Sequence, residues 1–272
     1  MSDKSNNHGI EKLLREIDNT LKWQSSNLHK KVADLLYPRL ESLLWLEKRL
    51  AIKGQLPPLS GWPAAPDFLL RLHTWVCKHK PQVVVETGSG VTTLVIADAL
   101  RQNGSGKLIS LEHLQEYADK TNETLKDEAL TAWVELRVGV LVPWYGEHLN
   151  PADAEKSSRW YSLDLEGIEQ INLLIVDGPP GATCLYARYP ALPAFFEWLA
   201  PTAEIWMDDA NRQEEKDISE AWAERYGFEL ELIPLEKGMS RLWRAGGVTP
   251  AAPSATVDTS ERSLGLDFSI GR

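Results

Sequence analysis

The sequence is poor in cysteine, has no excess of positive charge and contains no long apolar run. Its two cysteines, Cys77 and Cys184, lie far apart, which excludes a disulfide framework and favours reduced thiols. With 29 basic against 39 acidic side chains, the net charge of −10 argues against a nucleic-acid or anionic-membrane partner. No segment is long enough to span a bilayer, and the polar residues 1–7 do not resemble a signal peptide. We therefore expect a cytoplasmic protein.

Helical periodicity dominates the N-terminal part of the chain. Apolar residues recur every three or four positions over residues 10–52, which predicts a helical extension over residues 1–56. Ser25 and Ser26 predict a break in this helix, and Pro38 predicts a kink or a restart. We expect the extension either to pack on the main domain or to pair with a second copy in a homodimer.

The main domain is expected over residues 57–245. Within it, the segment Val83–Gly90 says most about the fold and the ligand. Three valines lead into Glu86 and a Gly-x-Gly turn, residues 91–100 have a helical pattern, and a second strand ends in the acid Glu112. The order strand, glycine turn, helix, strand and acid predicts a nucleotide-binding half-site. Glycine lets the backbone approach a ligand closely, the helix N-terminus attracts an anionic group, and the acid suits a ribose diol.

The remaining segments predict an α/β domain that ends in a hairpin. Strands are expected at 133–139, 171–177 and 204–209, and helices at 67–76 (with Asp67 as N-cap), 117–130, 192–199 and 214–226. Residues 228–233 and 240–244 are joined by a link too short for a parallel crossover, so they must pair antiparallel. The poorly periodic residues 141–168 predict a long loop, and the Gly-, Ser-, Thr- and Pro-rich residues 246–272 predict a disordered tail.

Four motifs in this order resemble those of class I S-adenosylmethionine-dependent methyltransferases. They are Val-Glu-Thr-Gly-Ser-Gly at 85–90, Leu-Glu at 111–112, Val-Asp-Gly-Pro-Pro-Gly at 176–181 and Asp-Asp-Ala-Asn at 208–211. The subgroup they resemble is the small bacterial "methyltransferase domain 24" type, distantly like catechol O-methyltransferase. This resemblance implies a Rossmann-like, seven-stranded, mostly parallel sheet whose last strand is antiparallel. It also implies S-adenosylmethionine as cofactor and transfer of methyl to an oxygen of a small molecule or a saccharide.

The resemblance also implies roles for individual residues. The glycine turn would surround the methionine moiety, either Thr92 or Thr93 would donate a hydroxyl near its carboxylate, and Glu112 would bind the ribose. His113 would lie at the adenine edge, and Asp177 would lie opposite the reactive methyl. The implied cofactor-binding set is Glu86, Gly88, Ser89, Gly90, Thr92, Thr93, Glu112, His113 and Asp177.

A hydroxyl acceptor must lose its proton, and the sequence offers two ways to remove it. In the first, Asp177, Asp208 and either Asp209 or Asn211 bind Mg²⁺, although Asp-Asp-Ala-Asn replaces the direct Asp-Asn pair of catechol-type enzymes. In the second, a side chain is the base. The candidates for the base are Asp177, Asp208 and His148, with Asp177 and Asp208 as the expected catalytic residues.

The methyl acceptor has its own candidate residues, each with an equally ordinary structural explanation. Arg188 and Tyr189 follow the Gly-Pro-Pro turn and are candidates to hold an anionic or sugar-like acceptor, or to pack at a helix start. Trp62, Trp144 and Trp160 lie in irregular sequence and are candidates to stack on an aromatic or sugar face, or to pack in a lid or core.

Three other functions compete with methyl transfer to a small molecule. A nucleotide-dependent oxidoreductase would have a third glycine where this chain has Thr93, and the terminal hairpin also argues against it. A nucleic-acid amino-methyltransferase would have no glycine between its acid and the two prolines, whereas Gly178 stands there. A non-catalytic binding or scaffolding protein remains compatible with the helical extension.

Overall fold

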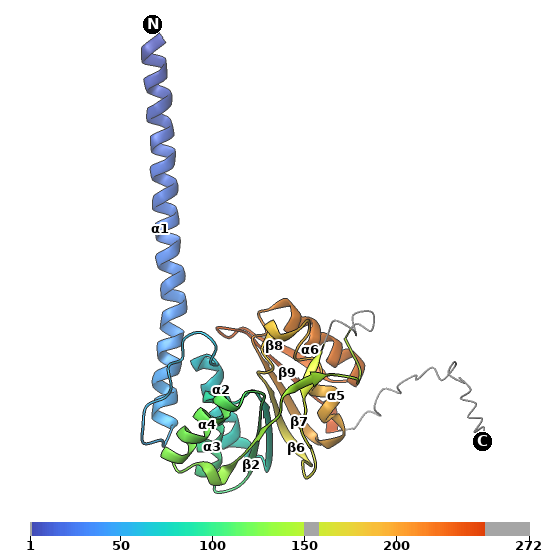
Figure 1. Cartoon of the computed structure of the whole chain (residues 1–272). Helices are drawn as coiled ribbons and strands as arrows, with labels where there is room; N and C mark the ends of the chain where they lie inside the picture. The colour runs from blue at the N-terminus through green and yellow to red at the C-terminus, as the bar shows by residue number, and fades with distance from the viewer. Residues whose placement is uncertain (1, 150–157, 248–272) are drawn as a thin grey trace, which may run out of the picture.

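The computed structural model of the chain describes residues 2–149 and 158–247. A mixed sheet lies at the centre of an α/β domain, and one long N-terminal helix projects from it (Figure 1). Of the predicted tail over 246–272, all but the first two residues lie outside the described ranges.

The sheet has seven strands in the order β3-β2-β1-β6-β7-β9-β8. Strands β3, β2, β1, β6 and β7 run parallel to one another, and β9 runs antiparallel to both of its neighbours. This confirms the predicted mostly parallel sheet with a reversed last strand. The bounds are β1 Val83–Thr87, β2 Lys107–Glu112, β3 Val134–Val138, β6 Ile171–Val176, β7 Leu199–Asp208, β8 Glu229–Ile233 and β9 Met239–Trp243.

The strand order places a topological switch point between β1 and β6. From β1 the chain builds outward through β2 and β3, then returns to place β6 and β7 on the other side of β1. The connections at the carboxyl ends of β1 and β6 therefore diverge. In open α/β sheets, the crevice that this divergence leaves is where ligands bind.

Helices cover both faces of the sheet (Figure 1). On one face, α2 (Pro66–His79) and α3 (Val91–Asn103) enclose a core with Trp206 of β7, and α4 (Gln115–Asp127) packs beside α3. On the other face, α5 (Ala191–Phe195) and α6 (Gln213–Tyr226) enclose a second core. Neighbouring residues of β7 alternate between the two cores, as strand geometry requires.

The predicted loop over 141–168 contains a strand pair, which the sequence did not indicate. β4 (Leu141–Pro143) and β5 (Arg159–Tyr161) pair antiparallel, with Leu141 opposite Tyr161. Trp160 and Tyr161 are buried in the same core as α5 and α6. At only three residues each, the strands are too short to show a periodic pattern.

The N-terminal helix α1 (Ser2–Arg49) is a single helix, so the predicted break at Ser25 and restart at Pro38 are wrong. Pro38 leaves the carbonyl of Asp34 without its usual donor, but Asp34 is exposed and water can satisfy that carbonyl. Near its end, α1 packs on α2 with Leu46 fully buried. The helix ends at 49, and an irregular connector leads to α2.

Two other boundaries differ from the prediction. Asp67 is not the N-cap of α2, because Ala65 takes that position and Pro66 begins the helix. The Asp67 carboxylate instead accepts the backbone N–H of Glu236, at 2.7 Å, and so ties α2 to the terminal hairpin. The helix predicted over 192–199 ends earlier, since Leu199 already begins β7.

Candidate cofactor and acceptor site

A cavity of about 600 Å³ opens at the carboxyl ends of the parallel strands, at the switch point. Its walls include the glycine turn after β1, residues 112–114 after β2, Tyr161 of β5 and the turn after β6. The connector before α2, Asp209 and two arginines complete it. The volume falls in the range of cavities that hold cofactors and small ligands.

The glycine turn needs glycine at Gly88. Its φ of +92° disfavours any side chain, and a Cβ there would lie 3.3 Å from the backbone nitrogen of Gly178. The two turns thus meet backbone to backbone at the floor of the cavity. Gly88, Ser89, Gly90 and Thr92 line the cavity, as the resemblance implied.

Glu86 and Thr93 lie beneath the turn and do not line the cavity. The Thr93 hydroxyl donates to the buried Glu86 carboxyl and accepts the backbone N–H of Gly90, at 2.9 Å. Burial raises the pKa of Glu86 to about 7. Because the Thr93 hydroxyl hydrogen is already used, Thr92 is the better placed of the two threonines to meet a ligand. Glu86 and Thr93 brace the turn from below.

Glu112 ends β2 and is fixed at the cavity wall by four donors. One carboxylate oxygen accepts the backbone N–H of Ser89 (3.2 Å) and its hydroxyl (2.9 Å). The other accepts the backbone N–H groups of His113 (2.7 Å) and Leu114 (3.0 Å). The His113 ring lies beside the same carboxylate, with Nδ1 3.0 Å from Oε1. The predicted ribose acid and adenine-edge residue are therefore neighbours on one wall.

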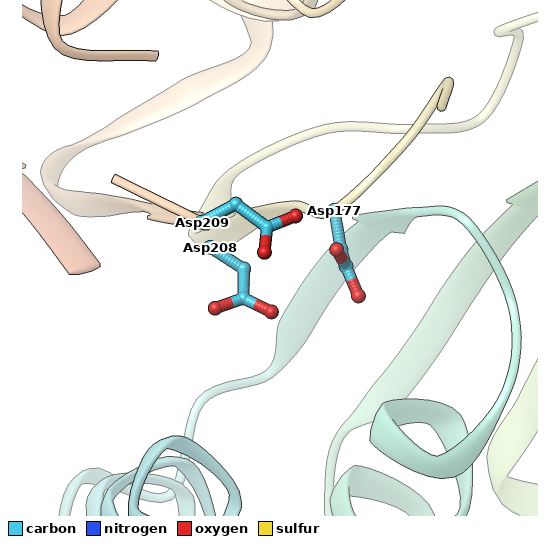
Figure 2. A group of neighbouring side chains, drawn as sticks. All are labelled: Asp177, Asp208 and Asp209. Atoms are coloured by element: carbon cyan, nitrogen blue, oxygen red, sulfur yellow. The ribbon is translucent and has the colours of Figure 1, made fainter. Parts of the chain in front are cut away.

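Three carboxylates gather where β6 and β7 end: Asp177, Asp208 and Asp209 (Figure 2). Their nearest oxygens lie within 4.8 Å of one another. Both carboxylate oxygens of Asp208 are buried and have no hydrogen-bond partner among the described residues. Asp177 and Asp209 line the cavity, and Asp208 lies behind them.

Arg188 supplies the positive charge that this acidic cluster requires. Its Nη2 lies 3.3 Å from Asp177 Oδ1 and 3.0 Å from Asp209 Oδ2, and its Nη1 donates to the backbone carbonyl of Asp208 at 2.8 Å. The guanidinium is buried, so these contacts are poorly screened. The sequence marked Arg188 as a candidate to hold the methyl acceptor. In the structure, its hydrogen bonds go instead to the three aspartates.

The pKa values of the cluster follow from burial and crowding. Burial first, and then the charge of Asp208, raise the pKa of Asp177 well above its usual range. Burial and the charge of Asp209 raise the pKa of Asp208 to about 6, against the opposing attraction of Arg188. A carboxyl pair with raised pKa values can take up a proton near neutral pH or bind a cation that relieves the repulsion.

Several other candidates lie away from the cavity. The exposed Asn211 donates its amide to the carbonyl of Glu236 at 3.2 Å and does not line the cavity. Tyr189 donates its hydroxyl to Glu147 and does not line the cavity. The cavity walls do not include His148, Trp144 or Trp160.

Sequence reasoning missed Tyr161, and it missed Lys237, which does not line the cavity but contacts a segment of its wall. Tyr161 lines the cavity from β5, and no periodic signal marks its strand. Lys237, in the link between β8 and β9, donates to the carbonyls of Gly61 (2.9 Å), Trp62 (3.3 Å) and Pro63 (2.8 Å). That clamp holds Trp62, whose side chain is 77% exposed, at the cavity wall.

Comparison with known proteins agrees with this geometry. The family model of a methyltransferase domain matches residues 85–210. An SAH-bound methyltransferase from Podospora anserina has the same fold, with a TM-score of 0.52 and 14% identity, over 82% of this chain and 96% of that one.

Two further solved structures are similar, and no curated protein matches the sequence. A methyltransferase from Geobacter sulfurreducens has a TM-score of 0.49 and 18% identity, over 80% of this chain and 96% of that one. An O-methyltransferase from Bacillus cereus in complex with SAH has a TM-score of 0.47 and 19% identity, over 80% and 97%. The predicted similarity to a methyltransferase domain is therefore confirmed over residues 85–210, and the fold is shared with a methyltransferase that binds SAH.

Proposed function

We propose that the protein transfers a methyl group from S-adenosylmethionine to an oxygen of a small molecule or a saccharide. One observation carries the proposal: a single cavity has Glu112 on one wall and Asp177 on another. Such a transfer needs two groups. One is an acid that binds the ribose of the cofactor, and the other is an acid near the methyl group that is transferred. The SAH bound by the Podospora anserina relative supports the same cofactor.

The cofactor would lie along the switch point. Its methionine part would meet the backbone of Gly88–Gly90 and the N-terminus of α3, whose free N–H groups attract a carboxylate. The Glu112 carboxylate would accept from the ribose hydroxyls, and His113 would lie at the adenine edge. Ser89 would act through Glu112, because its backbone N–H and its hydroxyl both donate to that carboxylate.

Methyl transfer from a sulfonium is an in-line displacement, so the protein mainly aligns the acceptor oxygen, the carbon and the sulfur. Asp177 would lie nearest to the acceptor oxygen, since it lines the cavity and Asp208 lies behind it. With its raised pKa, the pair of Asp177 and Asp208 can take the acceptor's proton near neutral pH. Arg188 holds Asp177 in place from the protein side.

The same three aspartates fit a divalent cation. They present oxygen ligands, which Mg²⁺ prefers, and the two oxygens of Asp208 have no donor among the described residues. Asp177, Asp208 and Asp209 would hold the ion, which would lower the pKa of a bound hydroxyl. Arg188 would then keep its contacts to the backbone carbonyls of Asp177 and Asp208.

Calorimetric titration with S-adenosylhomocysteine, with NAD as the control ligand, tests the proposal. We expect micromolar binding of the first and none of the second. Binding of NAD alone would favour the rival oxidoreductase. Binding of neither by a folded sample would favour a non-catalytic scaffold. An acceptor screen of small phenols and saccharides, with Mg²⁺ or with EDTA, then decides the acceptor class and the metal requirement.

We further propose that α1 joins two copies of the chain in the cytoplasm. Over residues 17–36, α1 exposes large apolar side chains at helical spacing, among them Ile17, Leu21, Leu28, Val32 and Leu36. An amphipathic helix gains most of its stability from packing that face, and a second α1 offers a matching one. The part near Leu46 packs on α2, which would leave the exposed part of the helix for the second copy. The two free cysteines support a reducing compartment.

No helix among the described residues is both long and apolar enough to cross a membrane.

A further inference from the structure

The cavity contains a buried hydroxyl that no described residue satisfies. Tyr161, at the end of β5, is only 5% exposed and lines the cavity. Its hydroxyl oxygen is buried and has no hydrogen-bond partner within the described chain. Buried hydroxyls are nearly always hydrogen-bonded, because an unmade bond has a desolvation penalty that nothing offsets. Such a group on a cavity wall indicates a ligand that completes it.

The Tyr161 ring is held rigidly, so its hydroxyl has a fixed position. Trp160 packs against it edge to face, with ring centroids 5.0 Å apart, and His113 does so from the other side at 6.3 Å. Its backbone pairs with Leu141 in the short β4–β5 ladder. A ring fixed by two aromatic neighbours and a strand pair loses little further freedom when its hydroxyl meets a ligand.

The hydroxyl lies where the turns after β1 and β6 meet. A Cβ built on Gly178 would lie 2.7 Å from the Tyr161 oxygen and 3.1 Å from the Cα of Gly88. Glycine at 178 therefore makes room for this hydroxyl. The ring also contacts His113, the neighbour of Glu112, so Tyr161 reaches the wall that carries the ribose acid.

The hydroxyl can act only as a neutral donor or acceptor. A free tyrosine loses its proton near pH 10. Burial first, and the charge of Glu112 next, raise the pKa of Tyr161 well above that ordinary value. The two residues therefore complement each other toward one ligand. The protonated hydroxyl of Tyr161 donates a hydrogen bond to the ligand, and the carboxylate of Glu112 accepts one from it.

We propose that Tyr161 is a ribose-binding residue whose hydroxyl donates to an oxygen of the methyl donor's ribose, while Glu112 accepts from the ribose hydroxyls. This inference rests on the proposed function, since it takes S-adenosylmethionine as the ligand. It assigns a cofactor role to the strand pair between β3 and β6, which had been expected to be an irregular loop. Glu112 would hold the ribose from β2 and Tyr161 from β5.

The test is calorimetric binding of two ligands to Tyr161→Phe, which removes only the hydroxyl. S-adenosylhomocysteine has the ribose and the amino-acid part, and 5′-methylthioadenosine has the ribose without the amino-acid part. We expect Tyr161→Phe to bind both ligands about tenfold more weakly, which is the usual effect of losing one buried hydrogen bond. Tyr145→Phe, at a side chain that is 90% exposed and off the cavity, is the matched control and should bind as the wild type.

Thermal unfolding separates this role from a structural one. Because the hydroxyl has no partner in the described chain, Tyr161→Phe should unfold at the same or a higher temperature than the wild type without ligand. A clear drop in unfolding temperature would show that the hydroxyl supports the fold and would overturn the proposal. Equal affinity of Tyr161→Phe and wild type for S-adenosylhomocysteine would also overturn it.

The two ligands separate the remaining outcomes. A loss of affinity for S-adenosylhomocysteine but not for 5′-methylthioadenosine would place the bond on the amino-acid part and overturn the ribose assignment. If the wild type binds neither ligand, the proposed function fails and takes this inference with it. If the wild type binds and only the Tyr161→Phe effect is missing, the proposed function stands and the inference about Tyr161 fails.

Discussion

At the scale of single residues, Glu112 links the glycine turn after β1 to the two residues that follow β2. Its two oxygens accept from Ser89 on one side and from His113 and Leu114 on the other. The residue also lines the cavity. This explains why a strand ending in an acid was informative: the strand end sets where the carboxylate lies, and the backbone donors around it fix its direction.

Glu112→Gln should weaken binding of S-adenosylhomocysteine about tenfold or more, because hydrogen bonds from a ribose diol to a charged acceptor are among the strong ones. Calorimetry measures the dissociation constant. Glu116→Gln, an exposed acid on α4, is the control and should leave affinity unchanged. Unchanged affinity in Glu112→Gln would contradict the placement of the ribose.

Asp177→Asn should lower the rate of methyl transfer about a hundredfold or more while changing cofactor affinity little, because general acid–base groups contribute at that scale. The rate with an acceptor found in the screen and the affinity for S-adenosylhomocysteine are measured on one preparation. A large loss of affinity with little loss of rate would make Asp177 a cofactor residue.

At the scale of elements, α1 and the β8–β9 link connect segments that the sheet does not join. The N-terminal part of α1 projects from the domain (Figure 1). Near its end, Arg39 pairs with Glu236 of the link at 2.6 Å and also donates to the carbonyl of Leu59. Lys237 of the same link clamps the Trp62 segment. The N-terminal helix, the connector and the hairpin are thereby tied together beside the acidic cluster.

The exposed face of α1 makes a prediction about assembly. Leu21→Glu combined with Leu28→Glu should turn a dimer into a monomer, because both side chains are mostly exposed, at 59% and 63%, and lie on the proposed contact. Light scattering on a sizing column measures the mass. Lys30→Glu, on another side of the helix, is the control. A wild-type chain that is already monomeric would contradict the pairing.

The clamp makes a prediction about local order. Lys237→Met should speed hydrogen exchange of the backbone amides over residues 57–65, because three carbonyl contacts to that segment are lost. Mass spectrometry of peptides over that segment measures the change. Lys53→Met, at an exposed side chain, should have no such effect. Equal exchange in both variants would mean that the proline-rich connector holds its conformation without the clamp.

At the scale of the whole molecule, the acidic cluster costs stability. The pKa of Asp208 is raised to about 6 in the folded protein, whereas an unfolded aspartate titrates near 4. Ionising Asp208 therefore disfavours the folded state: the penalty is absent below the unfolded value and full above about pH 6. The cluster is kept despite this penalty, as expected for a functional site.

Asp208→Asn should therefore raise the free energy of unfolding by up to about 3 kcal/mol near pH 8, and the gain should vanish near pH 4. Urea unfolding in EDTA measures the free energy at both pH values. Asp127→Asn, at an exposed side chain, is the control and should change little. An equal gain at both pH values would show that the ionisation of Asp208 is not the cause.

The sequence by itself determined what depends on residues close together in the chain. The glycine turn with its flanking strand and helix, the acid at the end of β2 and the antiparallel hairpin all follow from local patterns or from a link too short to cross the sheet. In parallel strands, the carboxyl ends all lie at one edge of the sheet, where ligand crevices form. Glu112 and Asp177 therefore had to lie at that edge.

Only the tertiary structure decided which side chains meet across long stretches of chain. Tyr161 reaches Gly178 and His113, Arg188 enters the acidic cluster, and Asp209 joins it. It also decided that α1 continues through Pro38, where water can replace the lost donor. These contacts depend on how elements pack against one another, and periodicity along the chain carries no information about that.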